Sequence, residues 1–195
     1  MKYTLGLDAW KQFVVAVAAA GCVALAPLPS AAQVPGRTSA AELSRSADKA
    51  LQQLYARIPA AKAIGKEAYA VLVFPSVTKA GLGIGAQYGE GALLKGGKAV
   101  AYYNTAGASY GLQAGAQTYG YAMFFMNEAA VKQLDKTDGF EVGVGPSVVV
   151  LDEGKARSIT STTMKDDIYA FIFSQKGLMA GLGVQGNKIT KITPK

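Results

Sequence analysis

The sequence lacks histidine, and it has only one cysteine and one tryptophan. Without histidine, neither a serine–histidine nor a cysteine–histidine nucleophile can form, and no imidazole is available to bind a metal ion. One cysteine cannot form a disulfide within the chain. These absences exclude much of hydrolase and metalloenzyme chemistry, so we expect a protein that is not an enzyme and that needs neither a cofactor nor a metal.

Long apolar runs are also absent after residue 32. Residues 1–32 have the pattern of a signal peptide, in which two lysines flank the start, an apolar run covers residues 13–26, and small residues precede Gln33. An alternative is a lipoprotein box at residues 19–22 that lipidates Cys22. Either pattern predicts an exported protein, which is periplasmic or secreted in the first case and anchored through Cys22 in the second. We expect residues 33–38 to be a linker and residues 39–195 to be a single domain.

The expected processed chain is basic. Removing Lys2 and Lys11 from the 20 basic residues leaves 18, and removing Asp8 from the 13 acidic residues leaves 12, which gives a formal charge of +6. Such an excess favours an anionic partner, for example a lipid headgroup. Basic and aromatic residues do not interleave as single-strand nucleic-acid platforms require, so we expect no nucleic-acid partner.

Glycine recurs at every second position in the middle of the chain. Gly81, Gly83 and Gly85 leave larger side chains on the opposite face, which is the period of a strand, and Gly111 and Gly115 repeat the pattern. Glycine inside a strand marks a bend, a bulge or a close approach of another backbone. We therefore predict that these five glycines are structural and that the sheet is strongly curved.

The remaining pattern predicts an α+β fold: a curved antiparallel sheet or partly closed barrel of glycine-rich strands, with an N-terminal amphipathic helix and a short mid-chain helix. Ser39 has capping-box spacing at the start of a helix that extends to about Arg57. Turns are expected at Gly96-Gly97 and at residues 104–107. The other expected elements are a helix over residues 59–63 that stops at Gly65, strands over 69–74, 80–95, 98–103 and 108–126, a helix over 128–134 capped by Asn127, and strands over 140–145, 147–151, 156–162, 168–174, 178–185 and 188–192.

Possible catalytic motifs lack their required context. Ser76 and Lys79 have the spacing of serine acylases, but the partner motifs of that class are missing. The glycine run from Gly81 lies within a strand pattern and opens no helix that could hold phosphate. The acidic pairs at residues 152–153 and 166–167 fall in expected turns. We therefore predict no catalytic residues.

Three ordered blocks of the sequence resemble the SYLF domain family. The first runs from Phe74-Pro75 through Lys79-Ala80-Gly81 to Gly89-x-Gly91, and the second is Ser109-x-Gly111-x-Gln113-x-Gly115-x-Gln117. The third combines Asp167-Ile168-x-x-Phe171 with Gln175-Lys-Gly-Leu178-x-x-Gly181. The resemblance covers about residues 41–192 and implies a non-catalytic domain. Eukaryotic members bind phosphoinositide membranes and in some cases actin, while similar bacterial members are secreted, periplasmic or lipoprotein-like and are described as lipid-binding.

Two functional hypotheses follow. In the first, the chain is a lipid-binding domain of the bacterial envelope, and lysines at loop ends contact anionic phospholipid or phosphoinositide-like headgroups; the candidates are Lys62, Lys66, Lys79, Lys95 and Lys98. In the second, it is a structural or interaction protein that uses exposed strand edges to bind a protein partner or another copy of itself. A contiguous positive surface favours the first hypothesis, and a long uncovered edge favours the second.

Overall fold

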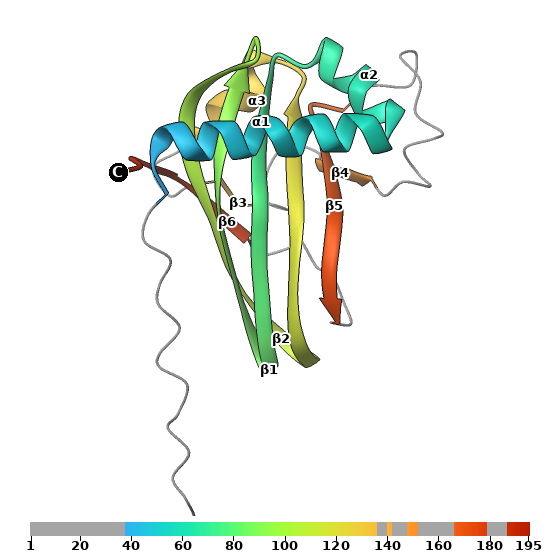
Figure 1. The fold of residues 1–195 in the computed structure, drawn as a ribbon, viewed down its shortest axis with the longest axis vertical. Coiled ribbons are helices and arrows are strands. Elements are labelled where there is room, and N and C mark those ends of the chain that lie inside the picture. Colours follow the sequence, from blue (N-terminus) through green and yellow to red (C-terminus); the bar gives the residue numbers. More distant parts are fainter. Residues whose placement is uncertain (1–37, 136–139, 142–147, 152–165, 179–186) are drawn as a thin grey trace, which may run out of the picture. The chain divides into compact units, whose positions relative to one another are not determined.

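The computed structural model describes residues 38–135, 140–141, 148–151, 166–178 and 187–195. The proposed signal peptide, Cys22, and the expected strand over residues 156–162 lie outside the described residues. None of the described helices is long and apolar enough to cross a membrane. Most of the described residues belong to one sheet with helices packed against it (Figure 1).

Two helices open the described chain. Helix α1 (Ala40–Arg57) begins as predicted at Ser39, whose side chain accepts a hydrogen bond from the backbone N–H of Glu42 at 3.3 Å. Helix α2 (Pro59–Glu67) has proline in its first turn, where the missing N–H needs no partner. Its predicted end at Gly65 is wrong. The helix continues for two residues, and Gly65 instead gives room to the ring of Tyr55, with which any β-carbon at this position would collide.

Strands β1 (Ala70–Lys95) and β2 (Lys98–Phe125) form a long antiparallel ribbon. They are joined at Gly96-Gly97, where both glycines have positive φ angles of 56° and 77°, so the predicted hairpin turn is confirmed. Two other predictions are wrong. β1 continues through Pro75 with a register shift between Phe74 and Val77, and β2 runs without a turn through residues 104–107, which stay paired with residues 87–90 of β1.

The ribbon bends sharply at residues 82–84, where the pairing register shifts again. In Figure 1 the first half of β1 (residues 70–82) descends to this bend, and the second half (residues 84–95) returns beside it. Glycine lets the halves approach: a β-carbon on Gly91 would lie 2.5 Å from the carbonyl oxygen of Val73, and one on Gly89 would lie 2.8 Å from that of Ser76.

The other edge of β2 carries two more strands. β5 (Ile168–Leu178) pairs with residues 116–125, and β6 (Asn187–Ile192) pairs with residues 102–107. The short strands β3 (Phe140–Glu141) and β4 (Val148–Leu151) extend the sheet beyond β6 and β5. The β4–β5 pair is parallel, whereas the other described pairs are antiparallel. The described sheet does not close, and the α+β prediction is confirmed.

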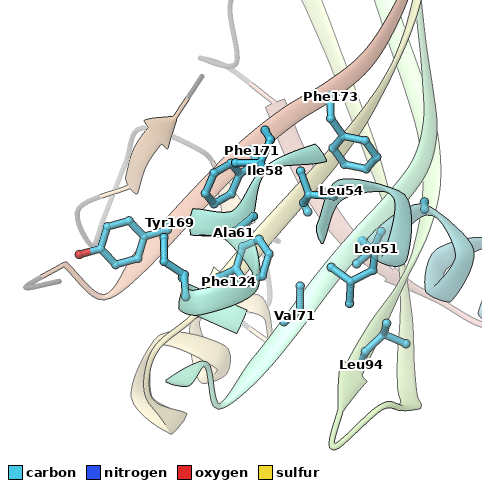
Figure 2. Close-up of a cluster of buried hydrophobic side chains, with 14 of the residues drawn as sticks. Leu51, Leu54, Ile58, Ala61, Val71, Leu94, Phe124, Tyr169, Phe171 and Phe173 are labelled. Atoms are coloured by element: carbon cyan, nitrogen blue, oxygen red, sulfur yellow. The ribbon is translucent and has the colours of Figure 1, made fainter. Parts of the chain in front are cut away.

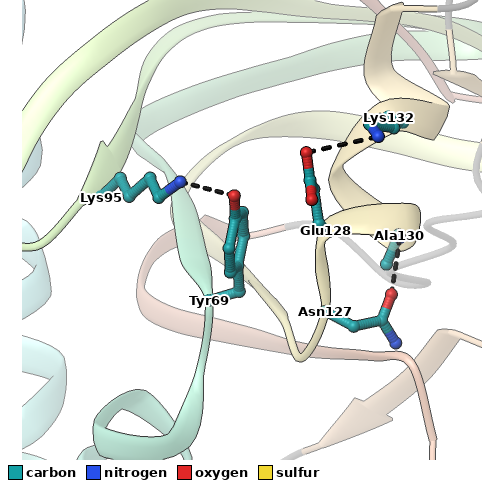
Figure 3. Close-up of polar contacts among 6 residues, drawn as sticks. All are labelled: Tyr69, Lys95, Asn127, Glu128, Ala130 and Lys132. Atoms are coloured by element: carbon teal, nitrogen blue, oxygen red, sulfur yellow. Dashed lines mark hydrogen bonds and ion pairs between the residues drawn. The ribbon is translucent and has the colours of Figure 1, made fainter.

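Alternation along the strands divides the core between the two faces of the sheet. One cluster packs Leu51 and Leu54 of α1, with residues of α2, against Val71, Phe124 and Phe171 (Figure 2). The second lies on the opposite face, where α3 (Glu128–Lys132) and the 3-10 turn η1 (Gln133–Asp135) cover part of it. Asn127 caps α3 as predicted, because its Oδ1 accepts the Ala130 N–H at 2.8 Å (Figure 3). The first cluster therefore holds α1 against the sheet.

Candidate functional site

A groove of about 580 Å³ opens where the C-terminal turn of α1 meets the sheet. We use "the groove" for the space lined by Gln53, Ala56, Arg57, Pro75, Ser76, Thr118, Tyr119, Gly120, Ser174 and Lys176. The helix contributes the first three residues, β1 the next two, β2 the next three and β5 the last two. Four elements that are distant in sequence therefore build one surface.

Backbone irregularities produce the groove. Pro75 has no N–H for the β1–β2 ladder, and the register shifts between Phe74 and Val77 around it. The β2–β5 register also shifts, between Thr118 and Gly120. Ser174 has a φ of 52°, the one positive value for a non-glycine residue in the described part of the chain. Bulges and left-handed residues are costly, and they concentrate beside functional surfaces.

The electrostatic character of the groove is positive. Arg57 and Lys176 line it from opposite elements, and both side chains are exposed. The other polar lining residues include Gln53, Ser76, Thr118 and Ser174, and the described lining residues contain no aspartate or glutamate. A guanidinium, an ammonium and several hydroxyls are the donors that bind a phosphate or carboxylate group. The described lining of the groove can therefore hold an anionic group.

One wall of the groove is held by a buried polar network. Tyr119 donates a hydrogen bond from its hydroxyl to Gln87 Oε1 at 3.1 Å, and Gln87 Nε2 donates to Asn187 Oδ1. All three side chains are buried. Burial raises the pKa of the Tyr119 phenol to about 12, so it stays protonated and can donate at neutral pH. The network links the two halves of the bent ribbon to β6.

The lysines predicted from sequence lie elsewhere. Lys62 and Lys66 are exposed on α2, and Lys95 and Lys98 are exposed on either side of the Gly96-Gly97 turn. Lys95 Nζ lies 3.9 Å from the centre of the Tyr69 ring and donates a hydrogen bond to its hydroxyl (Figure 3). Lys95 and Lys98 thus lie at the turn end of the ribbon, away from the bend, and none of the four lysines lines the groove.

Lys79 does not occupy the exposed loop end at which the sequence places it. It lies within β1, opposite Gln117, and its side chain is only 2% exposed. The physical reason is the continuity of β1 through Pro75: residues 77 and 79 then alternate onto the inner face of the bent ribbon. Lys79 therefore faces the protein interior together with four other buried polar residues, Gln87, Thr105, Gln117 and Asn187.

The glycines predicted to be structural fall mostly at the bend. A β-carbon on Gly81 would lie 2.6 Å from the carbonyl oxygen of Ile84, and Gly85 is buried beside it. Gly115 has a φ of 130°, and it pairs with Gly81 across the ribbon. Gly83 and Gly111 also belong to β1 and β2 near the bend. These backbone positions bring the first block of the sequence pattern next to the second.

Comparison with known families identifies the C-terminal part of the chain. Residues 106–193 match the family profile Ysc84, described as "Las17-binding protein actin regulator". This match agrees with the SYLF resemblance found in the sequence. The SYLF match includes the groove residues of β2 and β5, whereas Arg57 and Ser76 precede it. A search of curated proteins found no match.

The match to the SYLF family supports a non-catalytic binding domain. The described residues also contain no group of three or more histidine, cysteine, aspartate or glutamate side chains that could hold a metal ion. Sequence reasoning missed Arg57, which it treated as the end of a helix, and Lys176, which it treated as part of a family motif.

Proposed function

We propose that this protein is a non-catalytic lipid-binding protein of the bacterial envelope and that the groove binds the anionic headgroup of a phospholipid. The observation that carries the proposal is that Arg57 and Lys176 line the same groove, whose described lining residues include no acidic side chain. The match to the SYLF family supports lipid binding in general. An exported location follows from the signal-peptide pattern of residues 1–32, with lipidation of Cys22 as the alternative route to the membrane.

The groove suits a lipid headgroup better than a buried small molecule. It is a wide, open surface between a helix end and a sheet, and both of its cations are solvent-exposed. Exposed Lys and Arg side chains near an anionic membrane contribute about 1 kcal/mol each. Hydroxyls of Ser76, Thr118 and Ser174 can add donors to the same phosphate.

Vesicle flotation of residues 33–195 tests the proposal. The parent should float with vesicles of phosphatidylcholine and phosphatidylglycerol in equal parts and should not float with phosphatidylcholine alone. The double variant Arg57→Glu/Lys176→Glu should bind the anionic vesicles about thirtyfold more weakly or worse, because two attractions become two repulsions. Unchanged circular dichroism and melting temperature would show that the variant is folded.

A matched control reverses two exposed lysines outside the groove. Lys62→Glu/Lys66→Glu changes the net charge by the same amount and lies on the surface of α2. If both double variants lose affinity equally, net charge and not the groove determines binding. If the parent ignores headgroup charge, the lipid proposal fails.

The second candidate is an interaction protein that pairs its strand edges with a partner. The described β1 is hydrogen-bonded to β2 along one edge only, which leaves its other edge without a paired strand among the described residues. The close contacts of Gly89 and Gly91 with residues 73–77 place one half of β1 against the other. This packing limits access along much of that edge, so we favour the lipid proposal.

A further inference from the structure

Three large aliphatic side chains are exposed around the bend of the ribbon. Leu82 is 84% exposed, Ile84 is 66% exposed and Leu178 is 89% exposed. Leu82 and Ile84 flank the register shift of β1, while Leu178 ends β5 and pairs with Ala116 of β2. We call these three residues the tip. Exposed aliphatic side chains that gather at one end of a sheet mark a surface for contact with an apolar partner.

Small, uncharged residues lie beside the tip in the part of the ribbon whose side chains the structure describes. The exposed ones are Ala80, Ala86, Ala106, Ala108, Gly115 and Ala116. The bend is also the end of the ribbon, as Figure 1 shows, so the tip projects and is not a flat face. A projecting, uncharged end can enter a bilayer without desolvating a charged group.

Charged and aromatic side chains lie farther along the strands from the bend than the tip does. Leu178 is in register with Ala80, three residues before Gly83, which corresponds to about 10 Å along a strand. Lys176 is in register with Thr78, five residues before Gly83, or about 17 Å. Tyr88, 45% exposed, stands five residues after Gly83 on the returning half.

This layering matches a membrane surface. Apolar groups of interfacial proteins enter about 5–10 Å into the headgroup and acyl boundary, and tyrosine and lysine favour the headgroup level. Tyr88 is anchored there by a hydrogen bond from its hydroxyl to Glu90 Oε1 at 2.8 Å. Lys176 also lines the groove, so tip insertion would place the groove beside the lipid headgroups.

We propose that the tip is a membrane-insertion wedge, which enters the outer acyl region of an anionic bilayer while Lys176 and Arg57 contact headgroups. This inference rests on the proposed lipid binding and adds the part of the molecule that inserts. It differs from insertion through an N-terminal amphipathic helix, because α1 packs its apolar side on the sheet.

Tryptophan reporters in the full chain test the wedge. The single tryptophan is residue 10, so a Trp10→Phe background leaves Ile84→Trp or Leu178→Trp as the only indole. With anionic vesicles brominated on the acyl chain near the headgroup, emission from both reporters should shift to the blue and be quenched. Val100→Trp is the control, because Val100 is 57% exposed but lies near the Gly96-Gly97 turn.

A second variant distinguishes insertion of the tip from attachment through the N-terminal segment. Because that segment is identical in every protein compared, it cannot cause a difference between them. We expect that adding Leu82→Ser/Ile84→Ser to the Leu178→Trp reporter weakens insertion. The lipid concentration that gives half-maximal quenching should rise at least tenfold. The melting temperature should stay the same, because neither side chain is packed in the core.

Each outcome of these experiments supports or overturns a particular proposal. Vesicle binding without quenching at residues 84 and 178 overturns the wedge and leaves the headgroup proposal standing. No binding to any vesicle overturns both. Equal quenching at Val100 and at the tip also overturns the wedge, since it would mean non-specific adsorption. A lipid-free dimer that becomes monomeric with Leu82→Ser/Ile84→Ser would assign the tip to self-association instead.

Discussion

Gly81 and Gly85 lie so close across the bend of β1 that a β-carbon on Gly81 would collide with the Cα of Gly85. The neighbouring Ile84 carbonyl oxygen would be 2.6 Å away. Because the obstacle is backbone, a rotamer change cannot relieve the overlap. The bend that presents the tip therefore depends on the absence of a side chain at Gly81.

We predict that Gly81→Val lowers the free energy of unfolding by about 2 kcal/mol or more, because overpacking displaces the backbone of the returning half. Urea denaturation with a fluorescence or circular dichroism signal measures the change. Ala86→Val is the matched control, since Ala86 is exposed on the same strand and should tolerate the substitution. Equal stability of both variants would show that the close approach is not required.

Ser174 offers a test of the strain beside the groove. Its φ of 52° lies in the left-handed region, where glycine is favoured and a β-branched residue is strongly disfavoured. Ser174→Gly should melt at the same temperature as the parent or higher, and Ser174→Val should lose about 1–2 kcal/mol. Thermal unfolding measures both variants. A destabilised glycine variant would mean that contacts of the serine side chain outweigh the backbone strain.

The two basic surfaces should contribute differently to vesicle binding. Lys95→Glu/Lys98→Glu should retain most of the affinity for anionic vesicles, because these lysines lie at the opposite end of the ribbon from the tip. Stability should fall by less than about 1 kcal/mol through loss of the cation–π contact with Tyr69. Flotation of this variant beside Arg57→Glu/Lys176→Glu decides which cations contact lipid. A larger loss for the lysine pair would favour the hairpin end.

Alkaline pH should destabilise the fold through buried tyrosines. Burial raises the pKa of Tyr119 from 10.0 to about 12, and burial with the nearby Asp135 carboxylate raises that of Tyr103 to about 12. Since the folded chain holds these protons more tightly than the unfolded chain, their stabilisation is complete below pH 10 and is lost as the pH rises toward 12.

The corresponding experiment compares parent and Tyr119→Phe by urea denaturation between about pH 9 and pH 11. The phenylalanine variant loses the hydrogen bond to Gln87 at every pH, but its stability should decline less steeply as the pH rises. Parallel declines in the two proteins would contradict the assigned pKa.

Salt should separate the two parts of the lipid contact. Screening shortens the Debye length from about 10 Å at 0.1 M to about 3 Å at 1 M, which weakens the attraction of Arg57 and Lys176 to anionic lipid. Flotation at both salt concentrations should show a large loss for the parent and a small loss for Arg57→Glu/Lys176→Glu. Binding that does not change with salt would assign the contact to apolar groups alone.

Local signals in the sequence determined the parts of the fold that depend on neighbouring residues. Ser39 and Asn127 supply caps, Gly96-Gly97 supplies the positive φ angles of a hairpin, and apolar periodicity sets the buried side of α1. These features act within a few residues, so a pattern read along the chain contains the necessary information. The same reasoning ended a strand at Pro75 and placed a turn at residues 104–107, but at both places pairing with the opposite strand overrides local preference.

Only the tertiary structure decided which cations share a surface. Arg57 and Lys176 are separated by more than half of the chain, and they line one groove because α1 ends beside the positions where the β1–β2 and β2–β5 registers shift. The tertiary structure also decided that Lys79 is not on a surface. Because β1 continues through Pro75, the Lys79 side chain lies on the inner face of the ribbon and is buried. Burial and proximity depend on the register of strands that are distant in sequence, and a single residue pattern does not specify that register.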